Sequence, residues 1–422
     1  RHLRSHGYRT AAYGKLHLPC SPRNWIADDD DEFGDTYEDI NGTHGASEFL
    51  QYLEDLGLRD YEDSWHNTRC YGEKAIPIDA TPSKLPLEHT QEMWSATKAM
   101  RFIEQDVDRP FCIQVAMQKP HHPLLPNPRF WEIYASDLEL PTDWDRPPDH
   151  RPPHFREQWE QWRSYPWEFP EPDDAFEDFV RRSWRGTMAC VSQIDHVFGE
   201  LMTFLRDREL DQDTIVIFGS DHGAYHGLHG QLEKAPGICS EAVCRVPMIW
   251  RVPGVTPAGA VAEQLVENVD MTPTLCRLAD VPPLESVDGC DVSPILREPG
   301  GAHPVREVAV TENIWSRTIR WDRWRLVTYP RRMFDGRDEG ELYDLDADPH
   351  EHRNLYHDPA SRAVVHEGRS HLLDWLVETT RITTPSNTTI KNKRRTVELM
   401  SDGRAANRFM PTHRDDCLIN YL

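Results

Sequence analysis

Short apolar runs alternate with amphipathic stretches over residues 1–285. Thr214-Ile-Val-Ile-Phe218 and Pro110-Phe-Cys-Ile-Gln-Val-Ala-Met117 have the length and apolar character of buried strands. Apolar residues recur every three or four positions from Met188 to Leu205, which predicts a long helix with one buried face. A second such helix is predicted around Trp94–Ile103, just before one of the strands. A helix that packs back after each strand implies an α/β fold with a mostly parallel sheet sandwiched by helices.

Three other segments extend this pattern. Val246-Pro-Met-Ile-Trp250 is a further short strand, and Asp270-Met-Thr-Pro273 has the Asp cap and early Pro of a helix start. Residues 141–182 are rich in Pro, Trp and acidic groups. We therefore expect an irregular excursion there, of the kind that covers a site.

The pattern changes after residue 286. Short runs at 308–311, 318–321 and 325–329 predict antiparallel strands, and apolar positions near 361–379 predict one more helix. The chain from 383 onward is polar and weakly patterned. We expect three parts along the chain: an α/β domain at 1–285, a smaller α+β subdomain with an antiparallel sheet at 286–382, and a tail or oligomerisation arm at 383–422.

The composition is that of an ordinary globular protein, with 38% hydrophobic and 28% charged residues in 422. The net charge of −24 argues against a nucleic-acid partner or an anionic membrane surface, since both need basic protein surface. No apolar run approaches the ~20 residues of a membrane span. Nine cysteines without a C-x-x-C pair predict free thiols in a reducing compartment, so we expect a cytoplasmic location.

The candidate chemistry follows the apolar run that ends at Phe218. Ser220-Asp221-His222-Gly223 comes directly after it, and Lys234 lies a little further along. Open α/β sheets place their sites at the carboxyl ends of strands. Asp221 and His222 could hold a metal there, with Lys234 offering a positive charge to an anionic substrate. By themselves the two residues are equally compatible with a capped turn and a surface histidine.

Further sequence blocks accompany Ser220–Gly223. Together they resemble the sulfatase family of the alkaline phosphatase superfamily, which includes arylsulfatases and phosphonate monoester hydrolases, and they follow one another in that family's order. The resemblance rests on S-D-H-G at 220–223 with Lys234 and on six other blocks: G-Y-R-T at 7–10, G-K-L-H-L at 14–18, K-P-H-H-P at 119–123, H-G at 229–230, D-M-T-P-T-L at 270–275, and E-L-Y-D-L at 341–345 with Asp348, Glu351 and Asn354.

The resemblance implies a site built around one divalent metal ion, Ca²⁺ or alternatively Mn²⁺, and a small anionic ester substrate. It implies six site residues: metal ligands Asp221 and His222, substrate-holding Lys15 and Lys234, and reaction-centre His17 and His121. The implied roles make physical sense, because a tetrahedral anion needs fixed cations and donors around its oxygens. A histidine can also supply a proton to the leaving group near neutral pH.

Four neighbouring residues receive lesser roles. His121 is preferred to His122, which is expected to pack locally, because the family's histidine stands two before the proline. We expect His229 to be a turn or supporting residue. Glu241 and Arg245 are expected to form a buried ion pair that shapes the site without direct chemistry.

The family's nucleophile motif, C/S-x-P-x-R, normally precedes the block that here begins at Gly14. No such motif occurs in the 422 residues; Cys20-Ser-Pro-Arg23 has the wrong spacing and follows that block. The chain also starts without a Met, inside a basic, helix-like stretch. We expect that an amino-terminal portion is missing, that the chain carries half of the metal site, and that it has little or no hydrolase activity.

Three functions remain open at this point. The first is a metal-dependent hydrolase of sulfate esters, and the second is a phosphonate monoester or phosphodiester hydrolase of the same superfamily. The third is a non-catalytic protein that uses the fold to bind an anion or a partner. The tail after 383 makes a homo-oligomer an expectation as well. The sequence leaves the substrate and the metal undecided.

Overall fold

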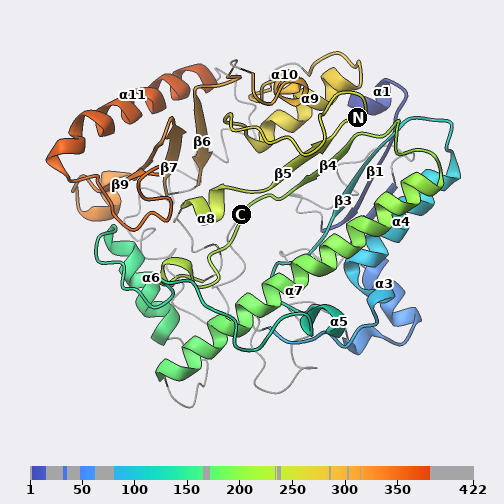
Figure 1. Cartoon of the computed structure of the whole chain (residues 1–422), viewed down its shortest axis with the longest axis horizontal. Helices are drawn as coiled ribbons and strands as arrows, with labels where there is room; N and C mark the ends of the chain where they lie inside the picture. The colour runs from blue at the N-terminus through green and yellow to red at the C-terminus, as the bar shows by residue number, and fades with distance from the viewer. Residues whose placement is uncertain are drawn as a thin grey trace, which may run out of the picture.

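The computed structural model places three parallel strands beside one another, with β1 (Arg9–Gly14) between β2 (Glu32–Asp35) and β3 (Phe111–Ala116). Helices lie above and below these strands (Figure 1). The predicted α/β sandwich with parallel strands is thus confirmed. The structure describes residues 2–15, 32–35, 48–61, 80–164, 172–232, 234, 239–284, 287–301, 304–313 and 315–380.

One face of the sheet is covered by α4 (Gln91–Gln105) and the long helix α7 (Pro172–Asp207). Tyr13 of β1, Phe102 of α4 and Leu201 of α7 meet in one hydrophobic cluster. Helices α9 (Met271–Leu278) and α10 (Ser293–Arg297) lie on the opposite side of the strands (Figure 1). Both helices predicted from apolar spacing, around 94–103 and 188–205, are therefore present.

The run that carries the candidate site forms β4 (Val216–Gly219), which pairs with β5 (Met248–Arg251) in an antiparallel ladder. The connection between them includes the short helix α8 (Glu241–Cys244). The ring of Phe218 meets Phe198 of α7 edge-on at 5.7 Å, which fixes β4 along the long helix.

The prediction of an irregular excursion at 141–182 was wrong for about half of that stretch. Residues Pro153–Ser164 form α6, and α7 already begins at Pro172. Phe176, Phe179 and Val180 of α7 are buried in one cluster at helical spacing. Proline is tolerated in the first turn of a helix, so the prolines mark helix starts here.

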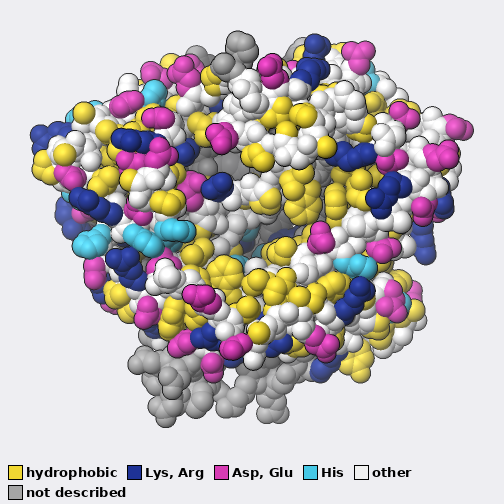
Figure 2. All heavy atoms as spheres, in the orientation of Figure 1, with side chains coloured by type: hydrophobic (Ala, Val, Ile, Leu, Met, Phe, Trp, Pro, Cys, Tyr) yellow, Lys and Arg dark blue, Asp and Glu magenta, His cyan; other side chains and the backbone are white. Residues whose placement is uncertain are grey.

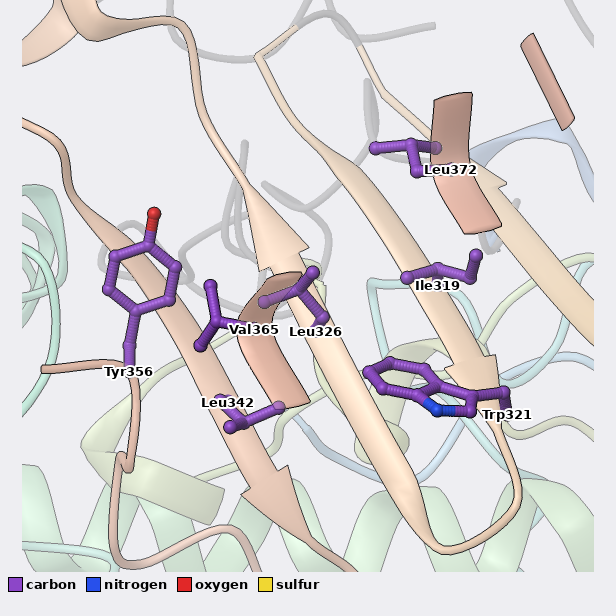
Figure 3. Packing of buried hydrophobic residues seen from close by; sticks show 7 residues of the cluster. All are labelled: Ile319, Trp321, Leu326, Leu342, Tyr356, Val365 and Leu372. Carbon is purple, nitrogen blue, oxygen red and sulfur yellow. The ribbon is translucent and has the colours of Figure 1, made fainter. Parts of the chain in front are cut away.

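The C-terminal part is an antiparallel sheet, as predicted, with a fourth strand in addition to the three expected. Its strands are β6 (Val308–Glu312), β7 (Arg317–Trp321), β8 (Trp324–Thr328) and β9 (Gly340–Asp344), paired in chain order. Helix α11 (Arg362–Thr379) packs across one face. Figure 3 shows the packing, in which side chains from the strands and α11 meet around the fully buried Leu326.

Helix α9 begins after Asp270 as predicted, but the Asp270 side chain does not cap it. The carboxylate accepts the backbone N–H groups of Glu267 and Cys290, both at 2.7 Å, and so ties two loops together. The remaining short helices are α1 (His2–Ser5), α3 (Glu48–Asp55) and α5 (Pro128–Trp131).

Six cysteines belong to the described part of the chain, and all six are free thiols. None of the helices in that part is both long and apolar enough to cross a membrane.

Candidate metal and anion site

The carboxyl ends of β1 and β3 lie side by side. Gly14 pairs with Ala116 in the parallel ladder, and the N–H of Lys15 donates to the carbonyl of Ala116 at 2.9 Å. Gly14 has a φ of +106°, and a Cβ there would lie 1.9 Å from the Ala116 oxygen, so only glycine fits. Because β1 ends at Gly14, Lys15 lies just beyond the strand, not within it. His17 lies outside the described residues.

Asp221 and His222 follow β4 and are held by local contacts. The backbone N–H of His222 donates to Asp221 Oδ1 at 2.9 Å, and the His222 Nδ1 lies 2.8 Å from the Gly223 carbonyl oxygen. A carbonyl can only accept, so in the neutral imidazole Nδ1 carries the proton and Nε2 offers its lone pair. Nε2 lies 3.4 Å from Asp221 Oδ2. Two atoms at this spacing can bind one divalent ion.

Gly223 allows this turn to approach the helix behind it. Its N–H donates to the Val243 carbonyl at 2.8 Å, and a Cβ would lie 2.0 Å from the Ala242 oxygen. Any side chain at Gly223 would therefore push the Asp221–His222 pair away from α8.

The electrostatics of the pair also suit a cation. The Asp221 side chain is 79% exposed. Partial desolvation raises the pKa of Asp221, but the charges of His222 and Lys15 and the His222 N–H outweigh it and leave this pKa below its usual value. Asn268 donates from Nδ2 to the carbonyl of Ser220 at 3.0 Å, and its Oδ1 is buried without a hydrogen-bond partner in the described part. The available atoms are therefore an ionised carboxylate, an imidazole lone pair and a nearby amide oxygen.

His121 lies on a turn that leaves the same sheet edge as Lys15, after β3. Its N–H donates to the Gln118 carbonyl at 2.9 Å, and its Nδ1 lies 2.7 Å from the His122 carbonyl oxygen. The turn is anchored by Lys119, whose Nζ lies 3.1 Å from Glu92 in a buried ion pair. His122 is itself buried, in agreement with local packing. The structure thus brings Asp221, His222 and Lys15 together, while the reaction role of His121 stays a prediction.

Lys234 is half-buried and follows the loop that contains His229. His229 is buried and has a left-handed φ of +55°, and its N–H donates to Asp143 Oδ2 at 2.9 Å. Arg151 Nη2 lies 3.1 Å from His229 Nδ1. Desolvation and the charge of Arg151 lower the pKa of His229 to about 4. Desolvation raises the pKa of Asp143, but hydrogen bonds and charge from His229 outweigh it and lower the value to about 2.

The loop is tied to the C-terminal sheet by buried charges. Arg151 donates to the Glu351 carbonyl at 2.6 Å and pairs with Glu341 at 3.5 Å. Glu351 pairs with Arg325, and both side chains are 1% exposed. Its Oε2 also accepts the N–H of Glu241 at 3.1 Å. Glu341 and Glu351 of the E-L-Y-D-L block therefore have a structural role, because they hold Arg151 and the start of α8 in place.

The predicted ion pair between Glu241 and Arg245 was wrong. Arg245 is exposed and forms no ion pair within the described ranges, whereas Glu241 lies 4.0 Å from Arg325. The helix ends at Cys244, and the backbone of Arg245 is already extended. Sequence reasoning missed Arg325, Arg151 and Asp143, because each finds its partner far along the chain.

Comparison with protein families gives two matches. The Sulfatase family model matches residues 1–281, and the model for the C-terminal part of N-sulphoglucosamine sulphohydrolase matches residues 227–378. The chain is 29% identical over 383 residues to a choline-sulfatase of Rhizobium meliloti (strain 1021), covering 85% of this chain and 67% of that protein. It is 25% identical over 410 residues to the multifunctional alkaline phosphatase superfamily protein PehA of Trinickia caryophylli, covering 88% and 77%.

Solved structures share the fold. A phosphonate monoester hydrolase from Silicibacter pomeroyi superposes with a TM-score of 0.71 at 18% identity, covering 90% of this chain and 80% of that one. A protein solved in complex with its substrate D-glucosamine-2-N,6-O-disulfate gives a TM-score of 0.66 at 20% identity, covering 89% and 81%.

Proposed function

Because the chain belongs to the sulfatase family, a family of sulfuric ester hydrolases, we propose that it serves metal-dependent hydrolysis of sulfate esters. The observation that carries this proposal is the placement of Asp221 Oδ2 3.4 Å from Nε2 of His222, with the charge of Lys15 close enough to help lower the pKa of Asp221. This corner of the site, formed by Asp221, His222 and Lys15, combines a metal-binding pair with a cation for the substrate oxygens. An ester of sulfuric acid needs both.

The metal that we propose is Ca²⁺, with Mn²⁺ as the alternative. Sulfatases generally bind a divalent metal, and the donors near this corner are mainly oxygens, which Ca²⁺ prefers. The imidazole of His222 is the feature that favours Mn²⁺. A bound ion would polarise the ester oxygens, which is the chemistry that the protein groups cannot supply alone.

The protein groups would orient the substrate and move the proton. Lys15 lies at the sheet edge beside Asp221 and would hold one ester oxygen, and Lys234 would hold another from the opposite loop. His121, fixed by the buried Lys119–Glu92 pair, would give a proton to the leaving oxygen. His17 is proposed to share this task.

The nucleophile is the part that the 422 residues do not provide, because they contain no C/S-x-P-x-R motif. We therefore propose that the purified chain turns over little aryl sulfate by itself. The test compares this chain with the product of the complete reading frame, using p-nitrophenyl sulfate with added Ca²⁺ or Mn²⁺. Turnover by the longer product, lowered roughly a hundredfold or more by Asp221→Ala, would support the proposal. If the longer product carries the motif and is inactive, the non-catalytic binding function takes its place.

A phosphonate monoester or phosphodiester hydrolase is the second candidate. It is favoured by the similarity to PehA, which is described as multifunctional, while the phosphonate monoester hydrolase structures support only the shared fold. Competition between p-nitrophenyl sulfate and p-nitrophenyl phenylphosphonate in one assay decides between the two. The ester with the higher kcat/KM identifies the reaction for which the site is built.

A further inference from the structure

A second cluster of metal-binding side chains lies away from Asp221. Asp143, His229 and His352 each place one donor atom within 4.8 Å of the other two. Asp143 Oδ2 lies 2.9 Å from His229 Nδ1 and 3.4 Å from His352 Nε2. Two ligands of one tetrahedral ion, each about 2.0–2.2 Å from it, have the longer of these separations, and the shorter one would widen by a few tenths of an ångström. We propose that Asp143, His229 and His352 form a second metal site, for Zn²⁺ or a similar first-row divalent ion.

The contacts around His229 point one ring nitrogen at the cluster. Nδ1 lies 2.9 Å from Asp143 Oδ2 and 3.1 Å from Arg151 Nη2. In the metal-free chain Nδ1–H donates to the Asp143 carboxylate, and a metal ion would take the place of that proton. The proton would then lie on Nε2, which faces Glu351 Oε2 at 3.8 Å. A carboxylate on the far side of a metal-binding imidazole is a common arrangement.

The backbone fixes the same geometry. His229 is a non-glycine residue in the left-handed region, with φ +55°, and Asp143 accepts its N–H at 2.9 Å. Such conformations are unfavourable and persist where the surroundings hold them. His229, the central residue of the cluster, therefore has a conformational energy cost. This indicates that its surroundings hold the imidazole in one position.

Arg151 is the group that opposes a cation. Its Nη2 lies 3.1 Å from the nitrogen that the ion would take, so this contact must open when the metal binds. Arg151 keeps its other partners, the Glu351 carbonyl at 2.6 Å and Glu341 at 3.5 Å. The connected ion pairs, buried except at Glu241, contain four carboxylates and two guanidinium groups: Asp143, Glu241, Glu341 and Glu351 against Arg151 and Arg325. This excess of negative charge favours a divalent cation.

An ion can reach the cluster from solvent through His352. The His352 side chain is 31% exposed, and its ring stacks on that of His350 at 5.8 Å. Histidine side chains gather on the surface between α6 and β9 (Figure 2). Two imidazoles with one carboxylate suit Zn²⁺ and related ions better than Ca²⁺, which prefers oxygen ligands alone. The ion would clamp the loop before Lys234 to the segments that contain Asp143 and His352. This site does not depend on the proposed hydrolase activity.

The test titrates the metal-free 422-residue chain with Co²⁺ and with Zn²⁺ in the Asp221→Ala background and in excess Ca²⁺. We expect one Co²⁺ per chain with visible d–d bands and without the near-ultraviolet band of a thiolate ligand. His352→Gln should weaken binding by about tenfold or more. His350→Gln, a matched control on the stacked neighbour, should change it less than about twofold.

Two results would overturn the proposal: no saturable Co²⁺ spectrum, or equal affinity in the His352→Gln and His350→Gln chains. If His352→Gln fails to fold by circular dichroism, Asp143→Asn replaces it, because Asn keeps an oxygen for the His229 N–H and removes the charge. Metal binding at Asp221 and ester turnover are unaffected by either outcome, so failure here is separate from failure of the hydrolase.

Discussion

Asp221–His222 is an aspartate–histidine pair made by neighbouring residues, and Asp143–His229 is one made by residues 86 positions apart. The Asp221 side chain is 79% exposed, whereas those of Asp143 and His229 are 5% and 7% exposed. The exposed pair is held by a strand end and one turn. The buried pair depends on ion pairs that reach the C-terminal sheet.

The difference in exposure between the two pairs suggests different roles, one in ligand binding and the other in folding. A buried polar group must be paired within the protein, because its desolvation is costly. An exposed pair can leave its lone pairs to an incoming ligand at little cost to the fold. The buried pair is therefore expected to dominate stability, and the exposed pair the response to Ca²⁺ and ester.

The largest effect is expected from Arg325, which supports the buried pair through Glu351. Arg325→Met leaves the Glu351 carboxylate buried without its main partner, and such broken buried pairs cost about 3–5 kcal/mol. Urea unfolding followed by tryptophan fluorescence measures the change. Arg323→Met is the matched control: the Arg323 side chain is 47% exposed and its Nε lies 3.5 Å from Asp344, so the expected loss is at most ~1 kcal/mol. Equal losses would contradict the role given to the buried pair.

The next effect is a fall in stability with acid. The pKa of His229 is about 4 in the folded chain, against 6.5 as its ordinary value, so the unfolded chain binds more protons between these values. The free energy of unfolding of the metal-free chain should fall by up to roughly 3 kcal/mol from pH 6.5 to pH 4. Asp143 adds a further loss below its ordinary value of 3.8, as pH falls toward about 2. His229→Gln should flatten the first window only; an unchanged slope there would refute this assignment.

A smaller loss is expected from removing the acceptor of the buried pair. Asp143→Ala leaves the His229 N–H without its carboxylate, and a hydrogen bond to a charged group contributes about 1.5–3 kcal/mol. The measurement is thermal and urea unfolding in a chelator, so that no metal contributes. A loss below ~0.5 kcal/mol would mean that water replaces the carboxylate and that the pair is not a folding determinant.

The contrast also explains what the sequence could predict. The strand before Asp221 is visible as the apolar run 214–218, and the turn that presents the pair is local in sequence. The antiparallel strands β6 to β8 and helix α11 follow from the same short-range patterns. The spacing of apolar residues and the nature of the neighbouring residues determine such elements, so a single sequence is enough to place them.

The buried network could not be predicted in this way. Arg151 and Glu351 are 200 positions apart, and nothing in the local pattern of either indicates the other. The irregular composition of 141–182 also hid the helical spacing of Phe176 and Phe179. The sequence indicated Glu351 only as a member of the E-L-Y-D-L block. Its partners Arg151 and Arg325 could be identified only from the structure.

The smallest effect, and the sharpest test of the exposed pair, is expected from Asp221. Without metal, Asp221→Ala should change the free energy of unfolding by less than ~0.5 kcal/mol, because the carboxylate is mostly exposed and its contacts are local. At a Ca²⁺ concentration about ten times its dissociation constant, the unsubstituted chain should gain about 1.4 kcal/mol, and Asp221→Ala should lose this gain. Asp213→Ala, on an exposed aspartate of the turn before β4, should keep it. If both variants keep the gain, Ca²⁺ binds elsewhere and the corner at Asp221 is not its site; if Asp221→Ala unfolds the metal-free chain, the exposed pair belongs to the fold after all.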